Sequence, residues 1–336
     1  MCWSRSSTQD TLAAGRARSG RSGHGRLSGV TDRLMLLDTA SMYFRAFFGV
    51  PDSVRAPDGT PVNAVRGLLD FVNRLVSDYR PTHLACCWDN DWRPQWRVDL
   101  IPSYKAHRVQ LLVPGAPDLE VVPDPLQAQI PVIVDVLEAL GIAVVGADGF
   151  EADDVIGTLA TGAGMPVDVV TGDRDLFQLV DDEQAVRVLY IARGVGKHER
   201  VTNSWVRDKY GIDGHQYADF AALRGDASDG LPGVAGIGEK TAATLLGRFG
   251  DLPGIVAASL DPASDLAPGP RRRIKDAAAY LLVAPKVVAV ARDVDLGSPD
   301  LALRRTPKDA DTLVALSEKW GLGGSVARLV DTLTVR

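Results

Sequence analysis

Acidic residues gather at places in the chain where helices and strands are expected to begin or end. Asp38 and Asp89 each follow a short apolar run, and the other acids occur in Glu-Ala-Asp-Asp, Asp-Arg-Asp and Asp-Ala-Ser-Asp segments. The nine acids are Asp38, Asp89, Glu151, Asp153, Asp154, Asp173, Asp175, Asp226 and Asp229. If they converge in one crevice, their mutual repulsion must be neutralised by cations. Carboxylates and water are the ligands that Mg²⁺ prefers.

Two such metal ions, about 4 Å apart, are suited to phosphodiester hydrolysis. One activates a water molecule, and both stabilise charge on the attacking and leaving oxygens. The alternative is that the acids only cap helix N-termini, which is common for any single cluster. Four clusters at successive strand ends favour the metal site. No Ser–His or His–Cys arrangement competes, because the five histidines are scattered.

The order of apolar segments predicts an α/β fold with a mostly parallel central sheet flanked by helices. We expect strands at 34–37, 83–88, 143–145, 167–170 and 186–191, and helices at 41–48, 63–79, 124–140, 151–160 and 175–180. Ligands of such sheets bind beyond the carboxyl ends of the strands, where Asp38, Asp89 and Asp173 are expected to arrive. The sequence therefore predicts a catalytic domain over 34–203 and a helical region over 204–336.

A glycine-rich segment in the helical region has the spacing of a helix–hairpin–helix. Gly233, Gly236 and Gly238 allow a tight turn, and Lys240 and Thr241 open the helix that follows. The N–H groups of that helix start would bind a phosphate, so the segment is predicted to hold a DNA backbone without reading its sequence. The alternative is an ordinary turn between helices.

The segment 90–123 interleaves aromatic residues with cations and is interrupted by five prolines. A long segment without clear periodicity inside a domain is usually functional or disordered. Arg97, Tyr104, Lys105 and Arg108 could stack on unpaired bases and contact phosphates. The alternative is plain packing of Trp and Arg in a loop.

Composition limits the remaining possibilities. The 336 residues have a net charge of −6, which would be unusual for a nucleic-acid binder unless bound cations offset the acids. Three cysteines with poor spacing argue against a disulfide framework and predict a cytoplasmic location. No apolar stretch reaches the length needed to span a bilayer. Residues 1–33 are rich in Arg, Gly and Ser, and we expect a disordered basic tail there.

These motifs resemble those of the 5′ nuclease family, which includes the exonuclease domain of bacterial DNA polymerase I, phage 5′ nucleases and flap endonucleases. The matching stretches run from Leu-Leu-Asp38 through Phe-Glu-Ala-Asp-Asp154 to Gly-Ile-Gly-Glu-Lys-Thr241. The resemblance implies a PIN-like 5′ nuclease fold with a helical arch at about 90–123 and a C-terminal helix–hairpin–helix region. It also implies that all nine acids are metal ligands, with Asp38, Asp89, Glu151, Asp153 and Asp154 in the first group and the other four in the second.

The resemblance further implies roles for residues outside the acidic set. Lys105 and Arg108 would hold the scissile phosphate and Arg45 would contact phosphate, while Tyr104 and Phe44 would stack on bases. The hairpin would hold duplex DNA, with K⁺ as a candidate ligand. The chain departs from the family pattern at Thr39, Phe44, Asp91 and Gly230. These departures bear on substrate preference more than on catalysis.

From these features we expect a Mg²⁺-dependent, structure-selective 5′→3′ exonuclease or 5′-flap endonuclease, with Mn²⁺ able to substitute. It would act in replication and repair as a stand-alone monomer on DNA with 5′ ends, flaps or branched junctions, and RNA-containing 5′ strands are further candidates. Two alternatives stay open at this point. One is a protein that binds branched DNA without cutting it, and the other is a metal-dependent phosphatase on a similar scaffold.

Overall fold

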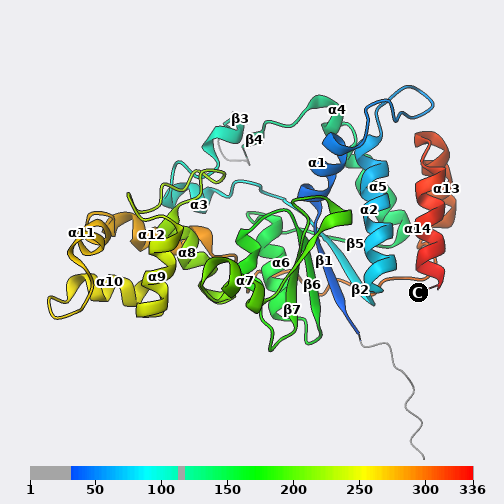
Figure 1. The fold of residues 1–336 in the computed structure, drawn as a ribbon. Helices are drawn as coiled ribbons and strands as arrows, with labels where there is room; N and C mark the ends of the chain where they lie inside the picture. The colour runs from blue at the N-terminus through cyan, green and yellow to red at the C-terminus, as the bar shows by residue number, and fades with distance from the viewer. Residues whose placement is uncertain (1–31, 113–117, 336) are drawn as a thin grey trace, which may run out of the picture. The chain divides into compact units, whose positions relative to one another are not determined.

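A six-stranded sheet lies at the centre of the first two-thirds of the chain (Figure 1). The structure is a computed structural model, and it describes residues 32–112 and 118–335. The strand order is β5-β2-β1-β6-β7-β8. The strands are β1 (Leu34–Asp38), β2 (His83–Cys87), β5 (Ala143–Val145), β6 (Val167–Thr171), β7 (Val186–Tyr190) and β8 (Glu199–Val201). All neighbouring pairs are parallel except β7 and β8.

The central strands are apolar on both sides because helices cover both faces of the sheet. In β1, Leu34 and Leu36 belong to one hydrophobic cluster, whereas Met35 and Leu37 belong to the other. Successive side chains of a strand point to opposite faces, so a continuous apolar run is what a doubly covered parallel strand requires. These short apolar runs made the strands predictable from the sequence.

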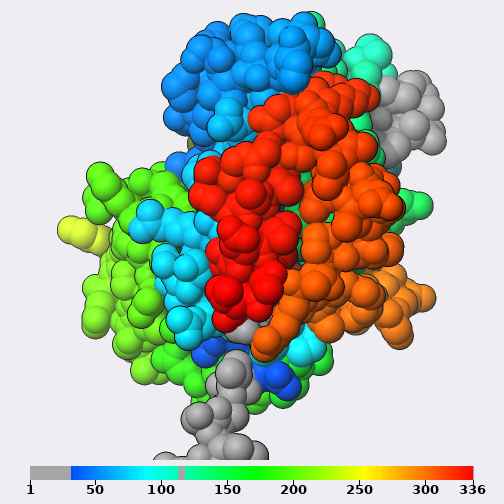
Figure 2. Space-filling view, turned by 90° about the vertical axis from the view of Figure 1, so that its right-hand side faces the viewer, coloured from blue at the N-terminus to red at the C-terminus, as the bar shows by residue number. Residues whose placement is uncertain are grey.

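The face that Met35 and Leu37 join is covered by α1 (Thr39–Gly49), α2 (Asn63–Tyr79) and α5 (Ile130–Leu140). Helix α2 packs on the sheet through apolar residues at helical spacing, as predicted. Two further helices, α13 (Ala310–Trp320) and α14 (Gly323–Val335), pack against α5 and α2. Figure 2 shows α14, in red, running over the outer side of this layer.

The opposite face carries α6 (Ala152–Thr161) and the short 3-10 helix η2 (Asp175–Leu179). The segment 289–291 crosses α6 at Gly157, where a Cβ atom would lie 2.5 Å from the carbonyl oxygen of Ala291; we call this segment the strap. Only glycine lets the strap approach α6 this closely. The contact fixes the helix that presents Glu151 and Asp153.

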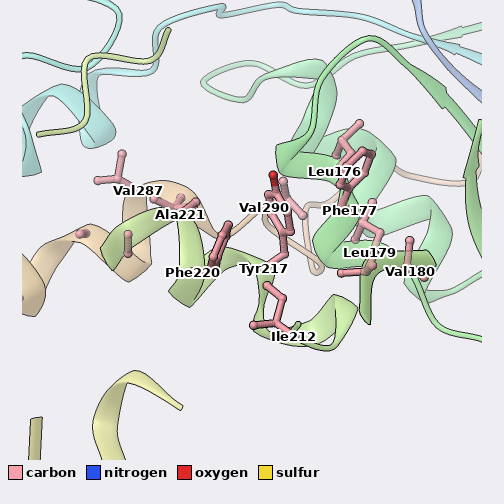
Figure 3. Close-up of a cluster of buried hydrophobic side chains, with 14 of the residues drawn as sticks. Leu176, Phe177, Leu179, Val180, Ile212, Tyr217, Phe220, Ala221, Val287 and Val290 are labelled. Atoms are coloured by element: carbon pink, nitrogen blue, oxygen red, sulfur yellow. The ribbon is translucent and has the colours of Figure 1, made fainter. Parts of the chain in front are cut away.

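The last third of the chain is helical, as predicted. Its elements up to the strap are α7 (Asn203–Tyr210), η4 (Gly214–Gln216), α8 (Tyr217–Arg224), α9 (Glu239–Phe249), α10 (Leu252–Leu260), α11 (Pro268–Asp276) and α12 (Ala278–Val288). Figure 3 shows a continuous cluster that extends from Phe177 of η2 past Val290 to Tyr217 and Phe220 of α8 and ends at Val287. The predicted boundary near residue 203 therefore does not interrupt the hydrophobic core.

The segment predicted to form a helical arch contains little helix in its described residues. It consists of α3 (Gln95–Leu100), a 3-10 turn η1 (Ala106–Arg108) and a two-stranded antiparallel ribbon of β3 (Val109–Leu111) and β4 (Leu119–Glu120). Pro94 precedes α3 and Pro102 follows it, and a proline disfavours the helical conformation in the residue before it. These prolines keep α3 short.

Three other local expectations differ from the structure. The helix expected over 124–140 is two helices, α4 (Asp124–Gln127) and α5, because Pro131 cannot continue a preceding helix. Strand β8 and the 3-10 turn η3 (Val195–Lys197) were not predicted, since neither contains an apolar run. The expected tail mostly lies outside the described residues, but Arg33 is held by an ion pair with Asp168 at 3.0 Å. No helix in the described ranges is long and apolar enough to cross a membrane.

Candidate active site

Acidic side chains from three strand ends meet in one cleft. Asp38 is the last residue of β1, and Asp89 and Asp173 each lie two residues beyond the ends of β2 and β6. Parallel strands bring their carboxyl ends to the same edge of the sheet, which is why the sequence could place these residues together. The acids that line the cleft are Asp38, Asp89, Glu120, Glu151, Asp153, Asp173 and Asp226.

A small neighbouring cavity accommodates the remaining part of the acidic set. Glu151, Asp153, Asp175 and Asp229 line it, and the first two also border the main cleft. Every acid that was predicted as a ligand, apart from Asp154, thus borders one of these two adjoining spaces. The hypothesis of a common acidic site is consistent with this arrangement.

Asp154 is the exception, and the structure corrects its predicted role. The side chain is fully buried, and Arg97 donates to both of its oxygens at 2.8 Å. The backbone N–H groups of Ala291 and Glu151 also donate to it, at 2.8 and 3.2 Å. With its acceptors used in this way, Asp154 anchors the first turn of α6 and does not face the cleft as a metal ligand.

Burial raises the pKa values of several acids in these two spaces. For Asp38 it raises the pKa from 3.8 to about 7, with further upward contributions from the charges of Asp89 and Asp173. Burial and neighbouring carboxylates likewise raise the pKa values of Asp153, Asp173 and Asp175. Each carboxylate that ionises here makes the next one harder to ionise.

Asp226, from the loop after α8, has a different environment. Burial acts to raise its pKa, but hydrogen bonds from Ser228 and the charges of Arg224 and Arg174 outweigh it and lower the pKa. Arg224 donates to Asp226 at 2.9 Å, and Arg174 lies 3.9 Å away. Asp226 is therefore neutralised by the protein itself, whereas the acids of the strand ends are not.

The donor set fits hard divalent cations. All the candidate ligands are carboxylates, which such ions prefer over nitrogen and sulfur donors. Asp175 Oδ1 is buried and has no hydrogen-bond partner, which is costly for a carboxylate unless a cation is nearby. Within residues 32–112 and 118–335, no three Asp, Glu, His or Cys side chains already form a tight metal-binding group.

Thr171 organises the acids but was not assigned a role from the sequence. Its hydroxyl donates to Asp38 Oδ2 at 2.7 Å and accepts from the backbone N–H of Asp173 at 2.8 Å. Asp38 also accepts from the backbone of Ser41 at 3.1 Å and so caps α1. The only sequence signal for Thr171 is its place directly before Gly-Asp-Arg-Asp.

Two cations stand at the base of the arch segment and point into the cleft. Lys105 donates to Glu151 Oε2 at 2.9 Å, and Arg108 donates to Asp229 Oδ1 at 3.0 Å. Burial acts to lower the pKa of Lys105, but the charge of Glu151 and other nearby groups raises it well above its ordinary value. Both residues line the cleft, and each is paired with one of the acids.

Two predicted DNA contacts, Tyr104 and Arg97, are buried instead. Tyr104 is 3% exposed and its hydroxyl donates to Glu151 at 2.8 Å, so its ring is not presented to a base. Arg97 is 2% exposed and holds Asp154 and the carbonyl oxygen of Val287. Arg97 thus holds Asp154 in the first turn of α6, and Tyr104 holds Glu151, the N-cap of that helix.

Phe44 and Arg45 lie on α1 at the side of the cleft. Phe44 lines the cleft and also a neighbouring groove that Arg45 lines. The Nε atom of Arg45 is buried and has no hydrogen-bond partner. Both residues are half-buried, so their predicted contacts with a base and a phosphate remain predictions.

The glycine hairpin connects α8 to α9, as its motif indicates. Gly233 and Gly236 have φ values of 65° and 76°, in the left-handed region that favours glycine. Gly238 is the N-cap of α9, and both Gly238 and Lys240 are exposed. Thr241 is half-buried in the first turn of α9. The helix start is thus open to an anion.

Comparisons with known proteins agree with this architecture. Residues 33–211 match the family described as "5′-3′ exonuclease, N-terminal resolvase-like domain", and residues 212–311 match "5′-3′ exonuclease, C-terminal SAM fold". The chain is 65% identical over 300 residues to a 5′-3′ exonuclease of Streptomyces coelicolor, covering 89% of this chain and 100% of that protein. It is 52% identical to a 5′-3′ exonuclease of Mycobacterium tuberculosis, covering 89% and 98% of the two chains.

A solved structure of low sequence identity shares the fold. It is the flap endonuclease of bacteriophage T5 in a pseudo-enzyme–product complex with DNA and metal ions. The TM-score is 0.59 at 16% identity, and the match covers 90% of this chain and 99% of the other.

Proposed function

The chain belongs to the 5′-3′ exonuclease family, and we propose that it cuts DNA at free 5′ ends and at 5′-flap junctions by metal-dependent hydrolysis. Members of this family are hydrolytic nucleases that act on DNA, which favours a catalytic protein over a non-catalytic binder of branched DNA. The observation that carries the proposal is the cleft in which buried carboxylates meet Lys105 and Arg108.

We propose that eight acids hold the metal ions in two groups. Asp38, Asp89, Glu151 and Asp153 form the first, and Asp173, Asp175, Asp226 and Asp229 form the second. Two Mg²⁺ ions, or Mn²⁺ in their place, would activate water and stabilise charge on the scissile phosphate. Thr171 would fix the position of Asp38 relative to Asp173 through its two hydrogen bonds. Tyr104 and Lys105 would hold the carboxylate of Glu151 at the cleft.

Lys105 and Arg108 would bind the scissile phosphate. Each forms an ion pair with a carboxylate, and a bound phosphate would compete with that carboxylate for the cation. Cations positioned in a partly buried cleft stabilise the charge that develops on a phosphate more strongly than exposed ones do. Arg45, with its unpartnered Nε, would contact a neighbouring phosphate, and Phe44 would pack against the adjacent base.

The hairpin would hold duplex DNA at a distance from the cut. The exposed N-terminus of α9 and Lys240 are suited to a phosphate, and K⁺ bound by the turn would add a further positive charge. The main grip on the duplex is thus independent of base sequence. The unpaired 5′ strand would pass by the segment 90–123, whose base carries Lys105 and Arg108.

We further propose that the protein acts as a monomer in the cytoplasm during replication and repair. Cys86 and Cys87 are free and buried, as in a reducing compartment. DNA flaps would be the main substrate, and RNA-containing 5′ strands would be a second one to test.

A labelled flap assay tests the proposed function. A 5′-flap duplex and a blunt duplex are incubated with the protein and Mg²⁺, with Mn²⁺, or with EDTA, and Asp153→Asn serves as the inactive control. We expect cleavage that requires a metal ion and is lost in the variant. Intact DNA under both metals would reject the proposal, and turnover of a chromogenic phosphomonoester without DNA cleavage would favour a phosphatase.

A further inference from the structure

Arg93 lies at the base of the arch segment and is almost completely buried. Its exposed fraction is 6%, and its guanidinium group makes three separate contacts. Nε donates to the carbonyl oxygen of Tyr104 at 2.6 Å, Nη2 donates to that of Pro102 at 3.2 Å, and Nη1 donates to Asp118 Oδ2 at 2.5 Å. A buried guanidinium with contacts to three different residues fixes their positions relative to one another.

These contacts join the two ends of the arch segment. Trp92, the neighbour of Arg93, donates from Nε1 to the carbonyl oxygen of Asp118 at 2.7 Å. The backbone N–H of Arg93 is itself held by Asp91 at 3.1 Å. Asp118 is thus bound by both its side chain and its backbone to residues that precede α3. These hydrogen bonds connect Trp92 and Arg93 directly to Asp118.

The contact with Tyr104 bears directly on Lys105. Lys105 has φ of 49° and ψ of 17°, a left-handed conformation that is uncommon for a residue with a Cβ atom. The peptide group between Tyr104 and Lys105 is held at both polar atoms, because the Tyr104 carbonyl accepts from Arg93 and the Lys105 N–H donates to the Asp229 carbonyl at 2.9 Å. Such a peptide cannot rotate without losing a buried hydrogen bond.

The conformation of this backbone decides where the amino group of Lys105 lies. In the present conformation Lys105 Nζ lies 2.9 Å from Glu151 and 3.4 Å from the carbonyl oxygen of Trp92, at the wall of the cleft. A return of Lys105 to an ordinary negative φ would redirect the side chain. The left-handed conformation is disfavoured for a residue with a Cβ atom, so it needs external support.

We propose that Arg93 is a positioning residue that holds Lys105 in the left-handed conformation and thereby aims its amino group at the scissile phosphate. The inference rests on the proposed function only for the role of Lys105 on phosphate. The support of the Lys105 backbone by Arg93 can be measured without any turnover. Asp118 contributes less to the position of Lys105. It accepts a hydrogen bond from Arg93 but does not contact the Tyr104–Lys105 peptide.

The kinetic test compares Arg93→Met and Lys105→Ala, singly and together, on a 5′-flap substrate. We expect Arg93→Met to lower kcat by about 10–100-fold with little change in KM, because a misplaced catalytic group loses rate more than binding. The double variant should be no slower than Lys105→Ala alone, since Arg93 acts through Lys105. Asp118→Asn, which keeps the contact with Tyr104, is the matched control and should lose less than about threefold. Arg93→Lys should recover part of the lost rate.

A second readout needs no activity. The rate at which a small imidoester modifies Lys105, followed by peptide mass spectrometry, reports how well its amino group is sheltered. The Lys105 side chain is 12% exposed, so it should react slowly in the unmodified protein and at least roughly threefold faster in Arg93→Met. Thermal unfolding shows whether each variant folds. If Arg93→Met does not fold, the kinetic and the modification measurements are made on Arg93→Lys. Lysine keeps the positive charge near Asp118 but lacks the several N–H donors of the guanidinium group.

The outcomes separate the two proposals. Multiplied rate losses in the double variant, or unchanged Lys105 reactivity in folded Arg93 variants, would overturn the positioning role. Failure of the unmodified protein to cut any DNA would overturn the proposed function instead, and the reactivity measurement would still decide the role of Arg93.

Discussion

The cleft and the glycine hairpin both present polar groups to the same kind of ligand, yet they are built in opposite ways. In the cleft the charged groups are buried, close together and paired, as Lys105 with Glu151 shows. In the hairpin, Gly238 and Lys240 are exposed. Buried charges interact strongly and tolerate little change, whereas exposed ones are screened by water and salt. We therefore expect catalysis in the cleft to depend on single residues. Binding of the DNA duplex at the hairpin should depend on the sum of many weak contacts.

The largest expected effect is that of removing one carboxylate from the cleft. Asp153→Asn should lower kcat by about 10³-fold, or roughly 4 kcal/mol, because Asp153 borders both spaces that hold the acids. DNA binding measured in Ca²⁺ should persist. Asp208→Asn, an exposed acid on α7, is the control and should cut normally. Full activity of Asp153→Asn would contradict the placement of metal ions in the cleft.

A second effect, on stability and not on the reaction rate, is expected from the ion pair behind the cleft. Arg97→Met should lower the free energy of unfolding by about 3–5 kcal/mol, because it leaves Asp154 buried without its partner. Urea denaturation of the metal-free protein measures it. Arg328→Met breaks an exposed pair with Asp70 and should change stability by less than about 1 kcal/mol. Equal losses in the two variants would show that burial of the first pair is unimportant.

The pH dependence of metal-free stability gives a third test of the cleft. The pKa of Asp38 is about 7 in the folded protein and 3.8 ordinarily, so the folded state binds more protons between these values. Stability should therefore fall as pH rises from about 4 to 7, by up to roughly 4 kcal/mol from Asp38 alone. Unfolding in EDTA at pH 4.5 and 7.5 measures this, and added Mg²⁺ should reduce the fall. A stability that rises with pH in EDTA would refute the assignment.

The smallest effect is expected at the hairpin. Lys240→Ala should weaken duplex binding by only a few-fold, about 1 kcal/mol, and reduce the salt dependence of binding by about one phosphate contact. The kcat of bound substrate should not change. Fluorescence anisotropy over a range of KCl concentrations measures the affinity. A drop in kcat comparable to that of Asp153→Asn would erase the distinction between the two regions.

Much of the fold could be predicted because its signals are local. The apolar runs of β1, β2 and β6 and the periodic spacing of α2 depend on neighbouring residues only. Asp38 and Asp173 could be placed at one edge of the sheet since every parallel strand ends there. The strand β8 and the division between α4 and α5 were missed, because the Glu-Arg-Val sequence of β8 contains no apolar run and a single proline carries a weak signal.

The amino-acid sequence by itself determined the acidic set, the parallel sheet and the glycine hairpin, since each follows from residue type and spacing. The tertiary structure alone decided which polar residues face the cleft. Asp154 and Tyr104 lie beside true cleft residues in the sequence, but they point to partners on α3 and α6. Such contacts join residues that are distant along the chain, as Thr171 and Asp38 are, and no local pattern encodes them.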